Sequence, residues 1–360
     1  MSLLTLISVM VVPILSVLVT VRVRKIAQQV QVLDIPTEES KKIHRTPTPL
    51  AGGVAVIIAW LCGVLLVWPE ITNGYVLPKH LVGIMIASLV IVVGGVWDDV
   101  KNLKPHMQIL APLTAIIIVI MSGIGVSTLT NPFGAPISLE GYRVVFFSIH
   151  GIPYGISLFA DLFTLVWLLG MMYTTKLLDG IDGLVSSMAI VGALFLALLS
   201  FTTRVNQPET GILALMLAGA FAGFLIFNWH PASIFLGESG SLFAGFSLGV
   251  LSIFSGAKIA TTLLIFALPI LDVMWVIGRR LFVEKRSPFS GDRLHLHQRL
   301  LDAGFSQRQT VVFLLSLTVA FGSCGLLFET KQKLIALTVA GLCMIMLGIA
   351  LSWKRKQPVD

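Results

Sequence analysis

The sequence is poor in charged residues. Only 12% of its 360 residues are Asp, Glu, Lys or Arg, whereas 56% are hydrophobic, a balance that is unusual for soluble globular domains. Segments of about ten residues with alternating polarity are also lacking, which excludes a membrane β-barrel. Apolar runs of roughly 17 to 25 residues, long enough to cross a bilayer as helices, recur instead. We therefore predict an all-α polytopic integral membrane protein.

Cysteine is scarce as well. The three cysteines, Cys62, Cys324 and Cys343, lie inside apolar runs and have neither paired spacing nor a neighbouring histidine cluster. This pattern excludes a disulfide framework and a cysteine zinc site, so we expect packing residues. Because the chain also has no break in composition and no visible repeat, residues 1–360 are predicted to form a single membrane-embedded domain.

Basic residues predict how the chain is oriented. Of the 25 Lys and Arg residues, nineteen fall on one side of the apolar runs, and such an excess marks the cytoplasmic side. We expect an N-terminus outside, a cytoplasmic C-terminus, and a first run retained as an anchor. The net charge of +7 then requires no nucleic acid. The eleven predicted spans are 3–21, 50–68, 80–97, 107–126, 157–173, 184–201, 210–227, 241–257, 259–278, 309–328 and 332–353.

Nearly all candidate functional residues fall on the predicted cytoplasmic side. The longest outer segment, 127–156, alternates turn residues with β-formers and predicts a small hairpin without chemistry. The active site is therefore expected on the cytoplasmic face. The predicted active-site loops are 34–49, 98–106, 174–183, 228–240 and 279–308.

Five carboxylates are predicted to lie at similar depth near this face. Asp98 and Asp99 end one span, Asp179 and Asp182 lie between two others, and Glu238 precedes another. Such a cluster needs cations for neutralisation, and acidic residues at membrane depth indicate function more often than solvated helix ends. If the stretch were helical, the three-residue spacing of the second pair would place both side chains on one face. The adjacent pair should point about 100° apart and have different roles.

A glycine- and serine-rich stretch, "FLGESGS", precedes one of the apolar runs. Its Ser239, Gly240 and Ser241 would offer free backbone N–H groups and hydroxyls to a phosphate at a helix N-terminus. The alternative is a helix-packing motif. Carboxylates beside a phosphate site favour Mg²⁺, or Mn²⁺, with Glu238, Asp179 and Asp182 as the predicted ligands.

Basic and polar side chains complete the predicted site. Two histidines two residues apart do not form a helical pair, and without cysteines a zinc site is not expected. Dense hydrogen-bond donors suit a nucleotide diphosphate better, although a solvated basic loop is the alternative. Asp272 is expected to pair with Arg279 or to support the site. The predicted substrate-binding residues are Lys41, His44, Arg45, Lys101, Lys176, Asn228, Ser239, Gly240, Ser241, Arg293, His295 and His297.

Four motifs in this order resemble the polyprenyl-phosphate N-acetylhexosamine-1-phosphate transferases of glycosyltransferase family 4. They are "WDDVKNL", "DGIDGL", "NWHPASIFLGESGSLFAGFSLG" and "SPFSGDRLHLHQRLLDAGFSQRQ". The last is more similar to the branch that uses UDP-N-acetylglucosamine than to the peptidoglycan branch, which typically has three consecutive histidines. The resemblance implies transfer of a sugar 1-phosphate from a UDP-sugar to undecaprenyl phosphate, with release of UMP and a requirement for Mg²⁺.

The resemblance also implies roles for the carboxylates. Asp98 matches the first of the paired aspartates, proposed as the base that prepares the lipid phosphate, and Asp99 is its partner. Asp179 and Asp182 match the acids of the second motif, and all four are the predicted catalytic residues. Glu238 stands where the family usually has a metal-binding Asp.

Three departures from the family pattern concern the same region. Tyr173 and Lys176 replace asparagines found in many relatives, which would bring a fixed positive charge to the diphosphate. Gln298 replaces a third histidine beside His295 and His297, which match the nucleotide-side loop. The longer Glu in place of Asp would shift a bound metal.

The resemblance implies a bacterial inner-membrane enzyme that starts lipid-linked synthesis of O-antigen, teichoic acid or a similar glycan. Its partners would be the lipid acceptor, the UDP-sugar and the bilayer, and a homodimer is one open alternative. Another UDP-N-acetylhexosamine or UDP-MurNAc-pentapeptide is an alternative donor. A secondary transporter is the alternative class, but its acids should lie near the midplane, often within related halves.

Overall fold

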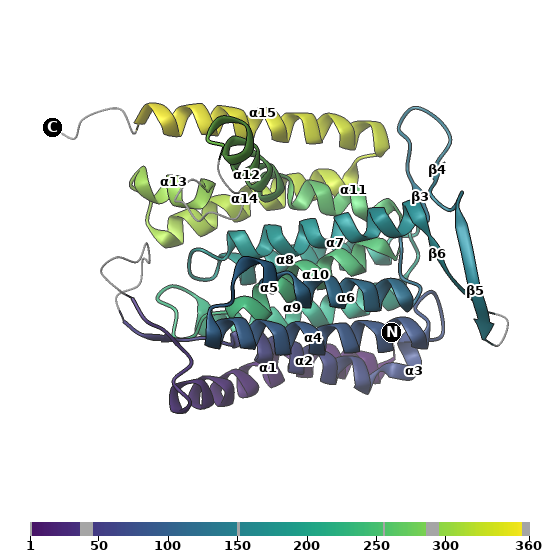
Figure 1. Ribbon diagram of the computed structural model, residues 1–360, viewed down its shortest axis with the longest axis horizontal. Helices are drawn as coiled ribbons and strands as arrows, with labels where there is room; N and C mark the ends of the chain where they lie inside the picture. The colour runs from purple at the N-terminus through teal and green to yellow at the C-terminus, as the bar shows by residue number, and fades with distance from the viewer. Residues whose placement is uncertain (1, 37–45, 150–151, 255, 286–294, 355–360) are drawn as a thin grey trace.

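The computed structural model is a bundle of helices with two distinct ends (Figure 1). It describes the chain except for residues 1, 37–45, 150–151, 255, 286–294 and 355–360. The helices are α1 Leu3–Gln29, α2 Gly52–Leu66, α3 Trp68–Ile71, α4 Pro78–Lys101, α5 Pro105–Gln108, α6 Leu110–Met121, α7 Leu158–Leu178, α8 Leu184–Phe201, α9 Pro208–Asn228, α10 Gly237–Ile253, α11 Gly256–Ile265, α12 Ala267–Gly278, α13 Leu296–Asp302, α14 Gln307–Leu327 and α15 Thr330–Lys354, with the π-helix η1 Arg279–Val283 after α12. The strands are β1 Leu33–Asp34, β2 Thr48–Pro49, β3 Thr128–Leu129, β4 Ile137–Ser138, β5 Arg143–Ile149 and β6 Ile152–Ser157.

Nine of the eleven predicted apolar runs lie mainly on one helix each, and the runs 107–126 and 259–278 are each divided between two helices. Not every helix is long enough to span a membrane. Seven described helices are long and apolar enough to span a membrane, and the number is eight if the bent pair is counted as one span. The count of eleven is therefore not confirmed. Helices α2, α6 and α10 have only 15, 12 and 17 residues. The run 259–278 is divided between α11 and α12, which meet at 74°; Pro269 lacks the N–H that would bond the Ile265 carbonyl.

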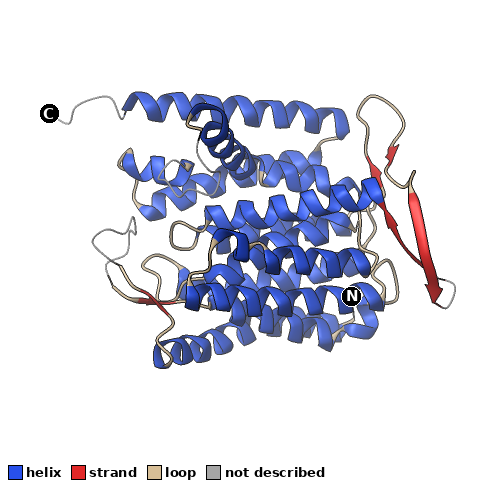
Figure 2. Cartoon of the chain, viewed as in Figure 1, coloured by secondary structure: helices blue, strands red, loops and turns tan. Residues whose placement is uncertain are grey.

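The short hairpins lie together at one end of the bundle (Figure 2). Strand β3 pairs antiparallel with β4, and β5 with β6, with a register shift between Val145 and Phe147. The hairpin predicted within 127–156 is confirmed and is joined by a second one. Strands β1 and β2 also pair antiparallel, near the opposite end.

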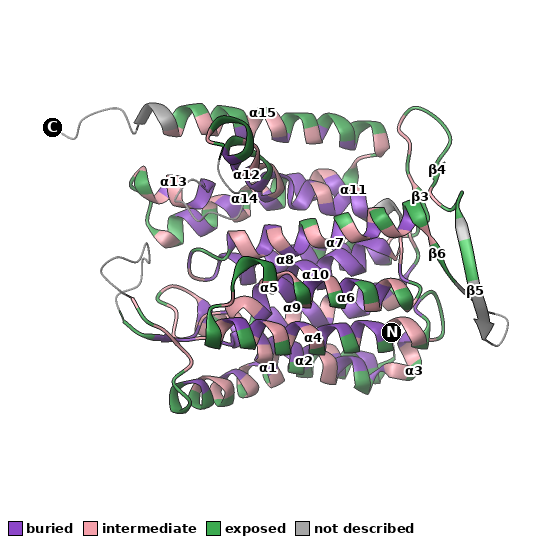
Figure 3. Cartoon of the chain, in the orientation of Figure 1, coloured by how far each residue is buried: buried purple, intermediate pink, exposed green. Residues whose placement is uncertain are grey.

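Helix α10 forms the centre of the bundle. Every residue from Ser239 to Ile253 is buried, whereas the outer helices α1 and α15 expose many side chains (Figure 3). Close backbone approach makes this packing possible: a Cβ on Gly53 of α2 would overlap the backbone of Gly240, and one on Gly95 of α4 would overlap Ser239. Small residues at such crossings allow helices in a membrane to pack tightly.

The topology brings the predicted functional segments to the end opposite the long hairpins. Helices α4, α7 and α9 end there, and α8 and α10 begin there (Figure 1). Helix α13 lies at the same end. Segments separated by as many as 200 residues of sequence therefore meet in one place.

Candidate active site

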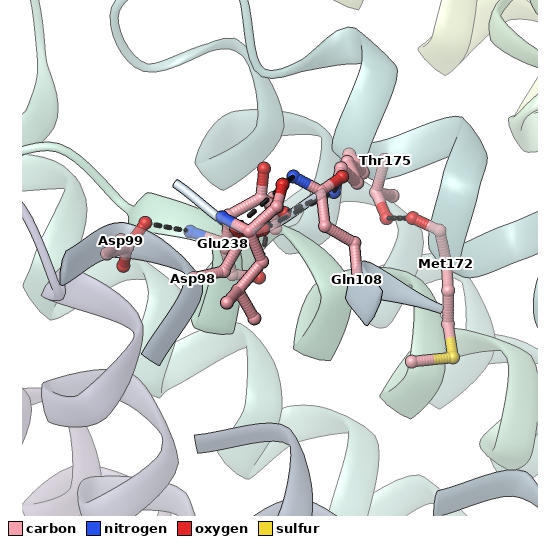
Figure 4. Close-up of polar contacts among 9 residues, drawn as sticks. Asp98, Asp99, Gln108, Met172, Thr175 and Glu238 are labelled. Carbon is pink, nitrogen blue, oxygen red and sulfur yellow. Dashed lines mark hydrogen bonds and ion pairs between the residues drawn. The ribbon is translucent and has the colours of Figure 1, made fainter. Parts of the chain in front are cut away.

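Lys176, in the last turn of α7, lies at the centre of the acidic cluster. Its Nζ is 2.8 Å from Glu238 Oε2 and 3.8 Å from Asp98 Oδ2. It also donates a 3.0 Å hydrogen bond to Gln108 Oε1. Figure 4 shows the side chains of Asp98, Gln108 and Glu238 gathered around this point. One ammonium group thus links α4, α5, α7 and α10.

Asp98 is fixed by the turn that follows α4. Its Oδ1 accepts hydrogen bonds from Leu103 N at 2.8 Å and Gln108 Nε2 at 3.2 Å. The turn is possible because Asn102 adopts a left-handed conformation with φ +48°, which Asn tolerates better than most residues. The motif "DDVKNLKPHMQ" is therefore a compact unit that holds one carboxylate toward Lys176.

Asp99 points elsewhere, as expected for the next position on a helix. Its Oδ1 accepts the Glu238 N–H at 3.0 Å (Figure 4). A side chain on Gly237, which has φ +72°, would approach Asp99 Oδ2 to 2.5 Å. This second oxygen is buried and has no hydrogen-bond partner among the described residues. Asp99 thus already occupies the N-terminal end of α10, where the sequence analysis expected a phosphate.

The segment from Asp179 to Gly183 is a turn between α7 and α8. The condition for a shared helical face is therefore not met, and the two acids have separate surroundings. Asp179 is exposed in this turn, yet desolvation of its carboxyl, with smaller contributions from Glu238, Asp99 and Asp182, raises its pKa to about 8. Asp182 Oδ2 instead lies 2.7 Å from His230 Nδ1 and accepts the Ala232 N–H at 3.0 Å. It fastens the loop that leads into α10.

The histidines of the last motif occupy two different environments. His295 Nδ1 is 2.9 Å from Asp272 Oδ2, and the other oxygen of that carboxylate accepts the Leu296 N–H at 2.9 Å. His297 is buried, and its Nε2 abuts Gly180 so closely that a Cβ there would overlap it. Burial lowers the pKa of His297 to about 3, so the ring is neutral. The rings are parallel, with centroids 5.9 Å apart.

Asp272 therefore supports the candidate site, one of the two alternatives left by the sequence. The other alternative fails because Arg279 pairs with Glu284 at 2.8 Å. A carboxylate on Nδ1 of a neutral histidine places the proton there and leaves Nε2 as the acceptor. Asp272 thereby sets both the position of the loop and the hydrogen-bonding character of His295.

Replacing Asp272 by Asn should reduce transfer activity by about tenfold or more. The amide has one accepting oxygen in place of two, and its NH2 group would favour the tautomer of His295 that lacks the proton on Nδ1. Steady-state kinetics should show the loss mainly in kcat. Asp302→Asn, an exposed change at the end of α13, is the matched control and should leave kinetics unchanged. Equal losses in both variants would contradict a positioning role for Asp272.

Other predicted binding residues have structural partners. Asn228 accepts from Ser186 Oγ at 2.8 Å and donates to the Ile234 carbonyl at 3.1 Å. Ser239 and Gly240 are buried in the helix crossings, which favours the packing alternative for this motif. Ser241 is also buried, and its hydroxyl donates to the Glu238 carbonyl at 3.3 Å. Lys101 is exposed at the end of α4. Lys41, His44, Arg45 and Arg293 lie outside the described residues.

The carboxylates do not form a ready set of metal ligands. Within the described part of the chain, no group of three or more His, Cys, Asp or Glu side chains is arranged to hold an ion. Glu238 pairs with Lys176, and Asp182 with His230. The metal site with Glu238, Asp179 and Asp182 as ligands stays a prediction. The present arrangement of these three side chains does not fit a bound ion.

Two residues in the site were not assigned by the sequence analysis. Gln108 bonds both Asp98 and Lys176, and His230 contacts Asp182. His230 lies inside the quoted "NWHPAS" motif, which was a usable signal. Gln108 follows Asp98 by ten residues, too far for contact along one continuous helix. The turn at Asn102 reverses the chain and brings the Gln108 side chain to Asp98.

Comparison with known proteins agrees with this arrangement. The family model described as glycosyl transferase family 4 matches residues 81–256. A probable undecaprenyl-phosphate N-acetylglucosaminyl 1-phosphate transferase from Bacillus subtilis is 26% identical over 346 residues, covering 94% of this chain and 89% of the relative. A decaprenyl-phosphate N-acetylglucosaminephosphotransferase from Mycolicibacterium smegmatis is 29% identical over 330 residues, covering 83% and 77%.

A phospho-N-acetylmuramoyl-pentapeptide-transferase from Leptospira biflexa is also similar. It is 27% identical over 296 residues, covering 75% of this chain and 77% of the relative. The matched region includes the ends of α4, α7 and α9 and the start of α10, which build the acidic cluster. The family match and these relatives together support glycosyl transferase family 4 and similarity to the polyprenyl-phosphate sugar-phosphate transferases.

Proposed function

We propose that this protein transfers a sugar 1-phosphate, most simply N-acetylglucosamine 1-phosphate, from a UDP-sugar to undecaprenyl phosphate. A lipid phosphate oxygen attacks the β-phosphorus of the donor. The new phosphoanhydride bond forms as the bond to the oxygen bridging the α-phosphorus breaks, and UMP leaves with that electron pair. The products are UMP and a polyprenyl-diphospho-sugar. The names of the similar proteins support a polyprenyl-phosphate acceptor and an N-acetylhexosamine phosphate.

The observation that carries the proposal is the convergence of all four motifs at one end of the bundle. Lys176, three residues before the second motif, joins the first and third motifs through Asp98 and Glu238. The fourth motif meets the second where His297 abuts Gly180. Acids gathered at one end, rather than midway along the helices, favour the enzyme over the transporter alternative.

The side chains offer distinct roles in this reaction. The lipid phosphate is already largely dianionic at neutral pH, with a second pKa of about 6 as in phosphoserine, so a strong base is not needed. Asp98, with Oδ1 already accepting two hydrogen bonds, would orient the acceptor rather than remove a proton. The Lys176 ammonium would offset charge on the transferred phosphoryl group. His295, held at Nδ1 by Asp272, would contact the donor through the other nitrogen of its ring.

The same proposal includes an orientation. The positive-inside pattern places the acidic cluster on the cytoplasmic face of a bacterial inner membrane, where a UDP-sugar would be available. Helix α1 begins at the hairpin end and α15 ends at the site end (Figure 1), which suits an N-terminus outside and a cytoplasmic C-terminus. The products would then enter O-antigen, teichoic acid or similar glycan synthesis.

The test is a reconstituted transfer reaction. Purified protein in detergent is incubated with undecaprenyl phosphate, Mg²⁺ and a panel of UDP-N-acetylhexosamines that includes UDP-MurNAc-pentapeptide, and both UMP and lipid-linked product are measured. We expect equal amounts of the two products from one preferred sugar, with about a hundredfold loss or more in Glu238→Ala. Lys104→Gln, an exposed change outside the cluster, should retain activity.

Each outcome decides between the alternatives. Product from one donor identifies the sugar. Product only from UDP-MurNAc-pentapeptide would move the chain to the other branch. Absence of UMP with every donor, in protein that is folded, would contradict the transferase proposal and return the transporter alternative.

A further inference from the structure

The charge balance of the acidic cluster is set by a residue of the chain itself. The Lys176 ammonium has an oxygen of Glu238 at 2.8 Å, one of Gln108 at 3.0 Å and one of Asp98 at 3.8 Å. An ammonium group has three donors, and these oxygens come from three different helices. A bound cation would be surrounded by oxygens in the same way, but here the cation is the Lys176 ammonium itself.

The ammonium is held in this position from several sides. The Lys176 side chain is only 13% exposed. Its Nζ lies 5.9 Å from the centre of the Tyr173 ring, one turn earlier on α7, within range of an attractive cation–π contact.

A divalent ion would require the same oxygens. Glu238 occupies the position expected for a metal ligand, yet it is the strongest ionic partner of Lys176. An ion bound at Glu238 would also face a positive charge within a few ångströms, and this repulsion is strong where water is largely excluded. Lys176 and a metal ion therefore compete for one place.

We propose that Lys176 is the resident cation of this site and lowers its affinity for divalent metal ions. Glu238 reaches the ammonium, with its Oε2 2.8 Å from Lys176 Nζ. The consequence for turnover rests on the proposed function, whereas the consequence for metal binding does not.

The test measures metal binding directly. Mn²⁺ is titrated into purified full-length protein, and free Mn²⁺ is followed by electron paramagnetic resonance, for the natural protein and for Lys176→Gln. We expect weak binding, in the millimolar range, for the natural protein and at least about tenfold tighter binding for Lys176→Gln. Lys104→Gln removes one exposed lysine at the same end and should bind like the natural protein.

A second variant separates charge from folding. Lys176→Arg retains a cation and should bind Mn²⁺ as weakly as the natural protein, so the comparison stands even if Lys176→Gln folds poorly. Micromolar binding by the natural protein, or affinity unchanged in Lys176→Gln, would overturn the inference.

Measuring how the transfer rate depends on Mg²⁺ distinguishes this inference from the proposed function. In the transfer assay, the Mg²⁺ concentration for half-maximal rate should fall at least about tenfold in Lys176→Gln. If transfer occurs but this concentration does not change, the inference fails and the proposed function stands. If no donor gives product, the proposed function fails, and Mn²⁺ binding still decides whether Lys176 competes with metal.

Discussion

Asp179→Asn should make the protein more stable at pH 8 and reduce transfer by about a hundredfold or more. Asp179 lies exposed in the turn that follows α7, and desolvation of its carboxyl, together with the nearby carboxylates of Glu238, Asp99 and Asp182, raises its pKa to about 8. A carboxylate whose pKa is raised beside other acids is typical of a functional position. The amide has nearly the same shape and needs no proton to be neutral.

The direction of the pH dependence follows from the two states of Asp179. In the unfolded chain the carboxyl has its ordinary pKa near 3.9, so between about pH 4 and 8 the unfolded state is deprotonated while the folded state retains the proton. The contribution of Asp179 to stability is therefore fully present below pH 4. It declines as pH rises through this window, by less than the limiting value of about 1.4 kcal/mol per pH unit, because solvent screens the charge of an exposed carboxylate.

Thermal unfolding of the detergent-solubilised protein at pH 5 and pH 8 checks this expectation. The natural protein should lose more stability between the two values than Asp179→Asn, and the variant should unfold about 2 °C or more higher at pH 8. Asp302→Asn, at an exposed carboxylate, should follow the natural protein. A variant that is less stable at pH 8 would show that Asp179 is charged and paired in the fold.

Gly180→Ala should reduce transfer by about tenfold or more and destabilise the protein by about 1–3 kcal/mol. A Cβ at this position would overlap His297 Nε2. His297 is only 1% exposed, so the ring must push into packed neighbours. Because His297 shares α13 with the residues after His295, the displacement would also disturb the contact with Asp272.

A glycine in the preceding helix supplies the control. Gly170 has no other side chain or backbone within 4 Å of the position where a Cβ would lie, so Gly170→Ala should be neutral or slightly stabilising, as alanine is in helices. Activity and thermal unfolding are measured for both variants. Unchanged activity in Gly180→Ala would mean that the position of His297 is not important for transfer.

Much of the architecture was predictable because the signals are long. Each apolar run became helical, since a run of such length has few other ways to satisfy its backbone in a membrane. Lengths were less predictable. Helix α10 is a 17-residue helix surrounded by others, and its sequence is as apolar as a span facing lipid. An apolar sequence indicates that a helix is shielded from water, but it does not show whether lipid or protein surrounds that helix.

The candidate site was predictable as a set of residues but not as a set of contacts. The acids were identified because charge is rare in such a chain. Asp99 bonds the start of α10, and Asp182 bonds His230. Both contacts depend on turns, at Asn102 and Gly183, whose conformation is set by the tertiary structure. The contact of Lys176 with a diphosphate stays a prediction. Its nearest ionic partner among the described residues, Glu238, was not predicted.

The backbone contact between Gly53 and Gly240 divides the active-site end into a stationary part and a part that is free to adjust. Helices α2, α4 and α10 touch through main-chain atoms, so none can slide without breaking a contact that has no flexible side chain to absorb the motion. The histidine segment is attached differently, through the side chains of Asp272 and His297 and after the bend between α11 and α12. Opening for a large lipid and closing around a nucleotide would therefore fall to the α12–α13 side, with the carboxylate side serving as the fixed reference.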